Sequence, residues 1–223
     1  MMRRLLLPLC ALLLVGGCSK PGGSDAQEPA SQERAAAASD EASGFDKLKF
    51  KDADDRERFS LKPKDDGAKL VDGDNRELAR YKWKGASLKV SGPDDSVLGH
   101  VVGSAGGALT VRDGAQTQIL FTLARQGTGW RLNDGKGALL YTVSPEDDGA
   151  RIQDGAGANV AHVKVREGKV SVRDTEGRTL LATKSLVRPD AAAVLAFEKL
   201  ELPLRGALLF FLQTPPTPEG RLP

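Results

Sequence analysis

Cysteine and histidine, the residues on which many catalytic and metal sites depend, are scarce in this sequence. The 223 residues include two cysteines, Cys10 and Cys18, and two histidines, His100 and His162. Structural zinc sites need several such ligands close together, and nucleophilic catalysis usually needs a base beside its nucleophile. No such grouping is present, so we expect no metal, no cofactor and no catalytic residue.

A surplus of charge of one sign is also missing. The chain has 32 Lys and Arg residues against 30 Asp and Glu residues. Residues 1–17 contain two arginines and no acidic residue, so 30 bases and 30 acids remain beyond them. Nucleic-acid-binding proteins usually carry a basic excess. The balance gives no support to a nucleic-acid partner.

No apolar run approaches the ~20 residues that a membrane-spanning helix needs. The N-terminal run, Leu5–Val15, has eleven residues and follows Arg3 and Arg4. Charge followed by a short apolar stretch is typical of a secretory signal peptide. The next residues, Val15-Gly16-Gly17-Cys18, resemble the lipobox of bacterial lipoproteins.

The lipobox resemblance implies cleavage between Gly17 and Cys18 and acylation of Cys18 with palmitate or similar chains. Cys10 would leave with the signal, so no free thiol would remain. Two or three acyl chains suffice for stable anchoring. Ser19, in place of aspartate, implies the outer membrane if the organism is Gram-negative. We therefore expect a lipid-anchored protein of the cell envelope.

The remaining chain divides by composition. Residues 18–44 are rich in Ala, Ser, Gly and Glu and predict a lipidated, disordered tether. Residues 45–213 predict one domain, and the proline-rich residues 214–223 predict a disordered tail.

The predicted domain contains an internal repeat of 20 or 21 residues. Each unit has an apolar-x-apolar pattern that leads into Asp-Gly or a variant of it, as in Leu109–Gly114. The second apolar residues are Leu70, Val90, Val111, Leu132, Ile152 and Val172. Alternation predicts strands, and Asp-Gly predicts a hairpin turn with positive φ angles. Six hairpins predict about twelve antiparallel strands, and residues 47–62 could add one or two.

The C-terminal part of the domain predicts helices. Asp190 is placed to cap a helix from Ala191 to about Leu200. Pro203 then begins a second segment, Leu204–Leu212, which is strongly apolar. Too short to span a membrane, this segment must be buried by the strands.

A mainly β fold follows, in which the meander closes into a barrel and the hydrophobic C-terminal helix fills it. A twelve-stranded barrel leaves a lumen that its own side chains cannot fill. This architecture resembles the tubby, phospholipid scramblase and LURP-one-related group, over residues ~47–213. The resemblance is architectural and implies no site residue here. A three-bladed propeller-like array and a β-solenoid are the alternatives.

The candidate site residues have ordinary structural explanations as well. His100 and His162 lie three units apart, which predicts opposite sides of the barrel, and we expect both side chains to face the solvent. Lys69, Lys89, Arg131 and Arg151 should point outward and form a basic wall that could bind an anionic lipid or envelope polymer. Trp83 and Trp130 fit core or edge packing better than sugar stacking. The aspartates of the turns should lie at one rim, as turn formers and not as calcium ligands: Asp72, Asp74, Asp113, Asp134, Asp154 and Asp174.

The sequence thus favours a membrane-anchored envelope lipoprotein that acts as a non-enzymatic binding or scaffolding module. The alternative is a lipid-binding or lipid-handling protein, as the tubby-like resemblance implies. A hydrolase is the third possibility. No protein partner is indicated.

Overall fold

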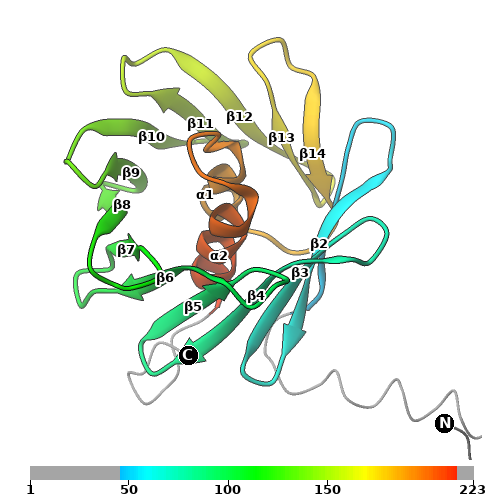
Figure 1. The fold of residues 1–223 in the computed structure, drawn as a ribbon. Helices are drawn as coiled ribbons and strands as arrows, with labels where there is room; N and C mark the ends of the chain where they lie inside the picture. The colour runs from blue at the N-terminus through cyan, green and yellow to red at the C-terminus, as the bar shows by residue number, and fades with distance from the viewer. Residues whose placement is uncertain (1–45, 215–223) are drawn as a thin grey trace, which may run out of the picture. The chain divides into compact units, whose positions relative to one another are not determined.

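The computed structural model describes residues 46–214, and they form a closed antiparallel barrel of fourteen strands around C-terminal helices (Figure 1). The first seven strands are β1 (Leu48–Lys51), β2 (Glu57–Lys64), β3 (Gly67–Asp72), β4 (Glu77–Lys84), β5 (Ser87–Ser91), β6 (Val97–Gly103) and β7 (Leu109–Arg112). The other seven are β8 (Ile119–Gln126), β9 (Gly129–Asp134), β10 (Leu139–Glu146), β11 (Gly149–Asp154), β12 (Asn159–Arg166), β13 (Lys169–Arg173) and β14 (Thr179–Thr183).

The predicted barrel is confirmed, with fourteen strands instead of about twelve; the two further strands lie where residues 47–62 were expected to add one or two. Each strand pairs with its neighbours in sequence, and β1 pairs with β14 to close the ring. The added hairpin is β1–β2, and its turn begins at Asp52. Ala53 follows that aspartate, so the Asp-Gly pattern does not identify this unit.

All seven hairpins that join an odd-numbered strand to the next even-numbered strand share one turn design. In each, the amide of the first turn residue donates to the carbonyl near the start of the returning strand, as Asp154 does to Ala158 at 2.9 Å. The register also shifts by a bulge in each of these hairpins, as between Ile152 and Gln153. Bulges bend and twist a sheet, which favours closure into a barrel.

The positive φ angles in these turns differ from the prediction. The glycine after the aspartate does not have positive φ; the fourth turn residue does, as in Asn75 (φ 67°) and Gly137 (φ 87°). The aspartate carboxylate itself organises the turn, since Asp154 Oδ1 accepts from the amides of Ala156 and Ala158, both at 2.9 Å. We call the end of the barrel formed by these seven turns the aspartate rim.

The glycine is required for a different reason. A Cβ at Gly135 would lie 1.9 Å from the carbonyl oxygen of Ile119, and one at Gly155 would lie 2.2 Å from that of Leu139. The four turns with this glycine, at Gly73, Gly114, Gly135 and Gly155, therefore cross directly over the start of the preceding even-numbered strand, where a Cβ would meet a backbone carbonyl.

The opposite rim is built from tighter turns. Two residues join the strands in five of its six connections, as shown by the pairing of Gln126 with Gly129 and of Arg166 with Lys169. Positive φ in these turns occurs at Gly85, Gly127, Glu167 and Gly168. These values match the mirror-image turns that suit the twist of a hairpin.

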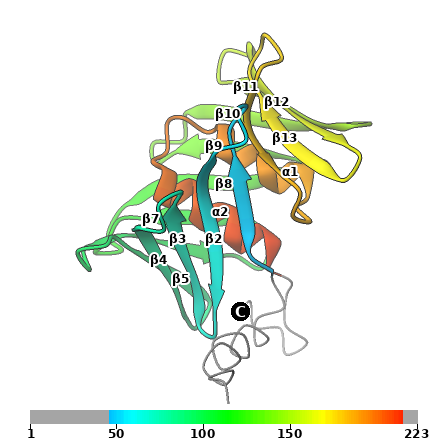
Figure 2. The ribbon, with the colours of Figure 1, turned by 90° about the vertical axis from the view of Figure 1, so that its right-hand side faces the viewer.

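The helices occupy the interior (Figures 1 and 2). They are α1 (Pro189–Ala192), the 3₁₀-helix η1 (Ala193–Ala196) and α2 (Leu202–Gln213). The first two contact β10–β13, and α2 contacts β3–β6 on the other side. The residues Ala191–Phe197 and Gly206–Phe211 are all buried. The lumen is therefore filled by apolar side chains, and none of the helices within residues 46–214 is long and apolar enough to span a membrane.

The start of the first helix differs from the prediction. Its N-cap is Arg188, Pro189 is its first residue, and no side chain caps it. Proline at that position sets a helical φ and needs no amide donor. Asp190 lies in the first turn and accepts instead from Trp130 Nε1 at 3.1 Å.

Aromatic contacts fix α2 against the wall. Tyr81 Oη donates to the carbonyl of Pro203 at 2.8 Å, and its ring stacks with that of Phe210 at 6.2 Å between centroids. Trp83 packs on Phe210 and Phe211. Trp130 is buried, with Arg125 3.9 Å above its ring centroid. Both tryptophans therefore serve packing.

Candidate functional site

The closure between β1 and β14 is the least regular part of the wall. One register pair, Lys51 with Ala182, joins these strands, whereas β2 and β3 share six. β1 has only four residues, and its outward side chains include Lys49 and Lys51. The wall thus has few paired residues where the first and last strands of the meander meet.

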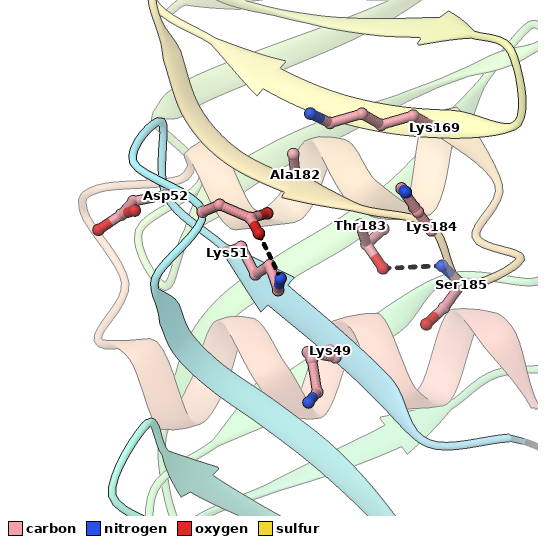
Figure 3. Close-up of a pocket in the computed structure, with 9 residues that line it drawn as sticks. Lys49, Lys51, Asp52, Lys169, Ala182, Thr183, Lys184 and Ser185 are labelled. Carbon is pink, nitrogen blue, oxygen red and sulfur yellow. Dashed lines mark hydrogen bonds and ion pairs between the residues drawn. The ribbon is translucent and has the colours of Figure 1, made fainter.

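A pocket of about 400 Å³ lies on the outer face of this closure, and we call it the seam pocket (Figure 3). Its lining residues come from β1, the turn after it, the start of β13 and the end of β14: Lys49, Lys51, Asp52, Asp55, Lys169, Ala182, Thr183, Lys184 and Ser185. Ala182 is small and is paired at the seam, which leaves space above it. Four lysines and two aspartates give the lining a formal charge of +2.

The register explains why the lysines gather. Lys51 pairs with Ala182, so antiparallel pairing brings Lys49 level with Lys184. Val170 pairs with Thr183, which brings Lys169 level with Lys184 from the other side. Like charges on neighbouring strands repel one another. An anion held between these ammonium groups would relieve that repulsion.

The acidic residues neutralise only part of this charge. Lys51 Nζ donates to Asp55 Oδ2 at 2.7 Å, and Lys49 Nζ pairs with Glu57 Oε2 at 2.8 Å. The hydrogen bond and charge of Lys51 hold the pKa of Asp55 below its usual value, and Lys169 and Lys184 lower it further. Neither Lys169 nor Lys184 forms an ion pair within residues 46–214. These two ammonium groups remain available to an anionic ligand.

The basic residues singled out from the sequence form no common site. Lys69 pairs with Glu77 at 2.8 Å, and Arg151 pairs with Glu146. These two charges are therefore compensated by neighbours on the wall. Lys89 on β5 and Arg131 on β9 form no ion pair within residues 46–214 and lie on separate strands. The repeat did not point to the seam lysines, because two of them precede the first aligned unit and the site forms only when the ring closes.

The two histidines lie apart, on β6 and β12, as predicted. His162 is outward, and its Nδ1 lies 3.9 Å from Glu146 Oε2. His100 also lies on the outer face, but it is 8% exposed, so the expectation that it is open to solvent was wrong. Burial, together with the nearby Lys89, lowers its pKa. Its Nδ1 is 3.5 Å from Ser87 Oγ.

The predicted aspartates do gather at the aspartate rim. Asp72, Asp113, Asp134, Asp154 and Asp174 each accept hydrogen bonds from backbone amides of their own turns. Asp74 pairs with Arg76 at 2.8 Å. Within residues 46–214, no group of three or more His, Cys, Asp or Glu residues could hold a metal ion. Cys18 and the signal cleavage position lie outside the described residues.

Comparison with known proteins gives little further guidance. No family model and no curated relative matches the chain. A protein from Arabidopsis thaliana, solved by X-ray crystallography, is 14% identical to it. The match covers 75% of this chain and 93% of that one, with a TM-score of 0.41. This low likeness adds nothing to what the strands and their register establish.

Proposed function

We propose that the protein is a lipid-anchored lipoprotein of the cell envelope, in the outer membrane if the organism is Gram-negative. Its barrel would act as a non-enzymatic binding module, and the seam pocket would hold an anionic group of the ligand. The observation that carries the binding site is the set of four lysines around one pocket, two of them without a described ion-pair partner. Lysine binds phosphate as a compact point charge.

The filled lumen supports a site on the outside. An apolar ligand would have to displace residues such as Leu208 and Leu209, which are fully buried. Removing a large apolar side chain from a core costs about 2–5 kcal/mol. The ligand would therefore bind on the outer wall or at the rims.

Liposome sedimentation tests the binding site. Residues 18–223 carrying Cys18→Ser, which lack the signal and cannot accept a lipid at that position, should bind vesicles of phosphatidylglycerol and phosphatidylcholine better than vesicles of phosphatidylcholine alone. Changing Lys49, Lys51, Lys169 and Lys184 to Gln should weaken that binding at least tenfold. A matched change of four exposed lysines elsewhere, Lys64, Lys82, Lys84 and Lys136, should have a much smaller effect. Equal losses in the two variants would count against a specific pocket.

Soluble polyanions distinguish the source of the anionic group. If a soluble polyphosphate competes with the vesicles, the pocket recognises the anion and not the bilayer surface. An enzymatic turnover that one point substitution abolishes would contradict the binding-module proposal. It would favour the hydrolase instead.

The anchor is tested separately by incorporation of an alkyne-tagged palmitate. Cys18→Ser should abolish labelling, whereas Cys10→Ser should leave it intact, because Cys10 would be removed with the signal. Labelling that survives Cys18→Ser would contradict the proposed attachment residue.

A lipid-handling protein of the tubby and scramblase type is the second candidate. A closed barrel around an apolar helix favours it, since that is the architecture of this group. Transfer of a fluorescent phospholipid between or across vesicles would support it. Binding without any transfer would favour the module.

A further inference from the structure

A second pocket lies on the aspartate rim, where the segment between η1 and α2 meets the barrel wall. It has a volume of about 410 Å³, and we call it the mouth pocket. Pockets for small ligands generally fall within ~300–1,000 Å³. The mouth pocket shares no lining residue with the seam pocket.

The mouth pocket contains an arginine that forms no ion pair among the described residues. Arg205, in the first turn of α2, is only partly exposed, and its Nη1 donates to the carbonyl of Leu195 at 2.7 Å. Its Nε is buried and has no hydrogen-bond partner among the described residues. No described carboxylate forms an ion pair with it. One of five N–H donors is thus used, although a buried charge is costly unless it is paired.

The other polar groups around the pocket are engaged or open to solvent. Asp154 uses Oδ1 to accept two turn amides. Glu198 and Lys199 are exposed. Tyr141 Oη accepts from the amide of Lys199 at 3.2 Å. Burial lowers the pKa of Arg205, and the charge of the exposed Glu198 offsets part of that effect.

The remaining wall is apolar. It includes Val160 from β12, Leu180 from β14 and Leu195 from η1. Leu180 is 43% exposed, which is unusual for a leucine in a barrel strand of this protein. An apolar surface beside an unpaired guanidinium matches a ligand with a charged head and an alkyl chain.

We propose that the mouth pocket binds an amphiphile with one anionic headgroup, a carboxylate or a phosphate. The headgroup would contact Arg205, and the alkyl chain would lie against Leu180 and Val160. Guanidinium donors match both headgroups geometrically. This site is independent of the function proposed above, because none of its residues belongs to the seam.

Isothermal titration calorimetry of residues 18–223 carrying Cys18→Ser tests the site with four probes that share a twelve-carbon chain. The charged probes are used below their micelle concentrations, and the alcohol is used below its solubility limit. The probes are dodecanoate, dodecyl phosphate, dodecanol and dodecyltrimethylammonium. At least one anionic probe should bind ten or more times more tightly than the alcohol and the cation. The preferred anion identifies the source, a free fatty acid or a phosphate-bearing lipid.

Two variants and a control locate the binding. Arg205→Gln should weaken binding of the anion at least tenfold and leave binding of the alcohol unchanged. Leu180→Asp should weaken binding of the anion to a similar extent, because the new carboxylate repels it. Leu180 is exposed, so this variant should fold and can replace Arg205→Gln if that variant does not. Arg188→Gln is the matched control, because Arg188 also donates to a helix carbonyl, that of Leu212 at 3.0 Å, outside the pocket.

The proposal is overturned if the alcohol binds as tightly as the anions, or if no probe binds. Unchanged anion binding by a folded Arg205→Gln, or by Leu180→Asp if Arg205→Gln does not fold, would also overturn it. The seam variant, in which four lysines are changed to Gln, should retain dodecanoate or dodecyl phosphate binding, so the failure of one site is distinguishable from that of the other.

Discussion

The two rims of the barrel solve the same problem, the reversal of a strand, by different means. On the aspartate rim, a carboxylate binds turn amides and a glycine lets the turn cross the neighbouring strand, as in Asp134-Gly135. On the opposite rim, two residues with little side-chain support reverse the chain, as at Gly127-Thr128. The turns of the aspartate rim are thus held by side-chain hydrogen bonds, whereas the turns of the opposite rim are held by backbone conformation.

Glycine substitution should give the largest difference between the rims. Gly135→Ala would force a Cβ to 1.9 Å from the carbonyl oxygen of Ile119, so we expect a loss of about 3 kcal/mol or more of unfolding free energy. Gly127→Ala meets no atom within 4 Å and incurs only the positive φ of 58°, roughly 1–2 kcal/mol. Urea denaturation of both variants checks this. Equal losses would mean that the close approach has no energetic role.

Aspartate removal should give an intermediate effect. Asp154→Ala leaves two turn amides without their acceptor, and we expect a loss of about 1–2 kcal/mol. Asp154→Asn keeps an acceptor and should recover about half of that loss. Asp147→Ala, in a two-residue turn of the opposite rim, should change stability by no more than about 0.5 kcal/mol. Thermal unfolding of the three variants would test this order.

The smallest difference should appear in the salt dependence of two carboxyl groups. The amide of Gln118 lowers the pKa of Asp113 on the aspartate rim, while Lys164 lowers the pKa of Asp148 on the opposite rim. Salt screens the exposed ion pair more than the backbone hydrogen bond. In 1 M NaCl, NMR titration should find that the pKa of Asp148 has returned toward its ordinary value and that the pKa of Asp113 is still lowered. If the pKa values of both Asp113 and Asp148 returned to the ordinary range, the two rims would not differ in salt dependence.

The sign of the corresponding stability effect is the same for both groups. A lowered pKa in the folded state contributes stability above the unfolded value of 3.8, and that contribution is lost as pH falls through the folded value. At high salt, Asp148 should therefore contribute little to the pH dependence of stability. Asp113 should continue to contribute.

Local patterns predicted most of the wall, because a strand with one buried face must alternate in sequence. Leu132 and Ile152 are fully buried at their repeat positions, and α2 begins one residue before Pro203. The strand count was low because Asp52 is followed by Ala53, so the first hairpin lacks the Asp-Gly signal. The position of the residue with positive φ was also predicted wrongly. The aspartate carboxylate organises a turn in which positive φ falls on the fourth residue, two residues after the glycine.

Neither pocket could be read from the sequence. The seam pocket unites Lys49 and Lys51 with Lys169 and Lys184, which are over a hundred residues away, and only ring closure brings them together. The mouth pocket depends on the unpaired state of Arg205, which no pattern reveals. Sequence periodicity reports which face is buried. It does not report which charges find a partner.

The helices inside the ring also limit how many repeats the protein can have. The diameter of a barrel grows with the number of strands. Deleting one 20-residue unit would leave no room for Phe197 and Leu209, whereas adding one would open space around them. The volume of the C-terminal helices thus fits a barrel with one particular number of repeats. A chain that gained or lost a unit would have to change residues 189–213 as well.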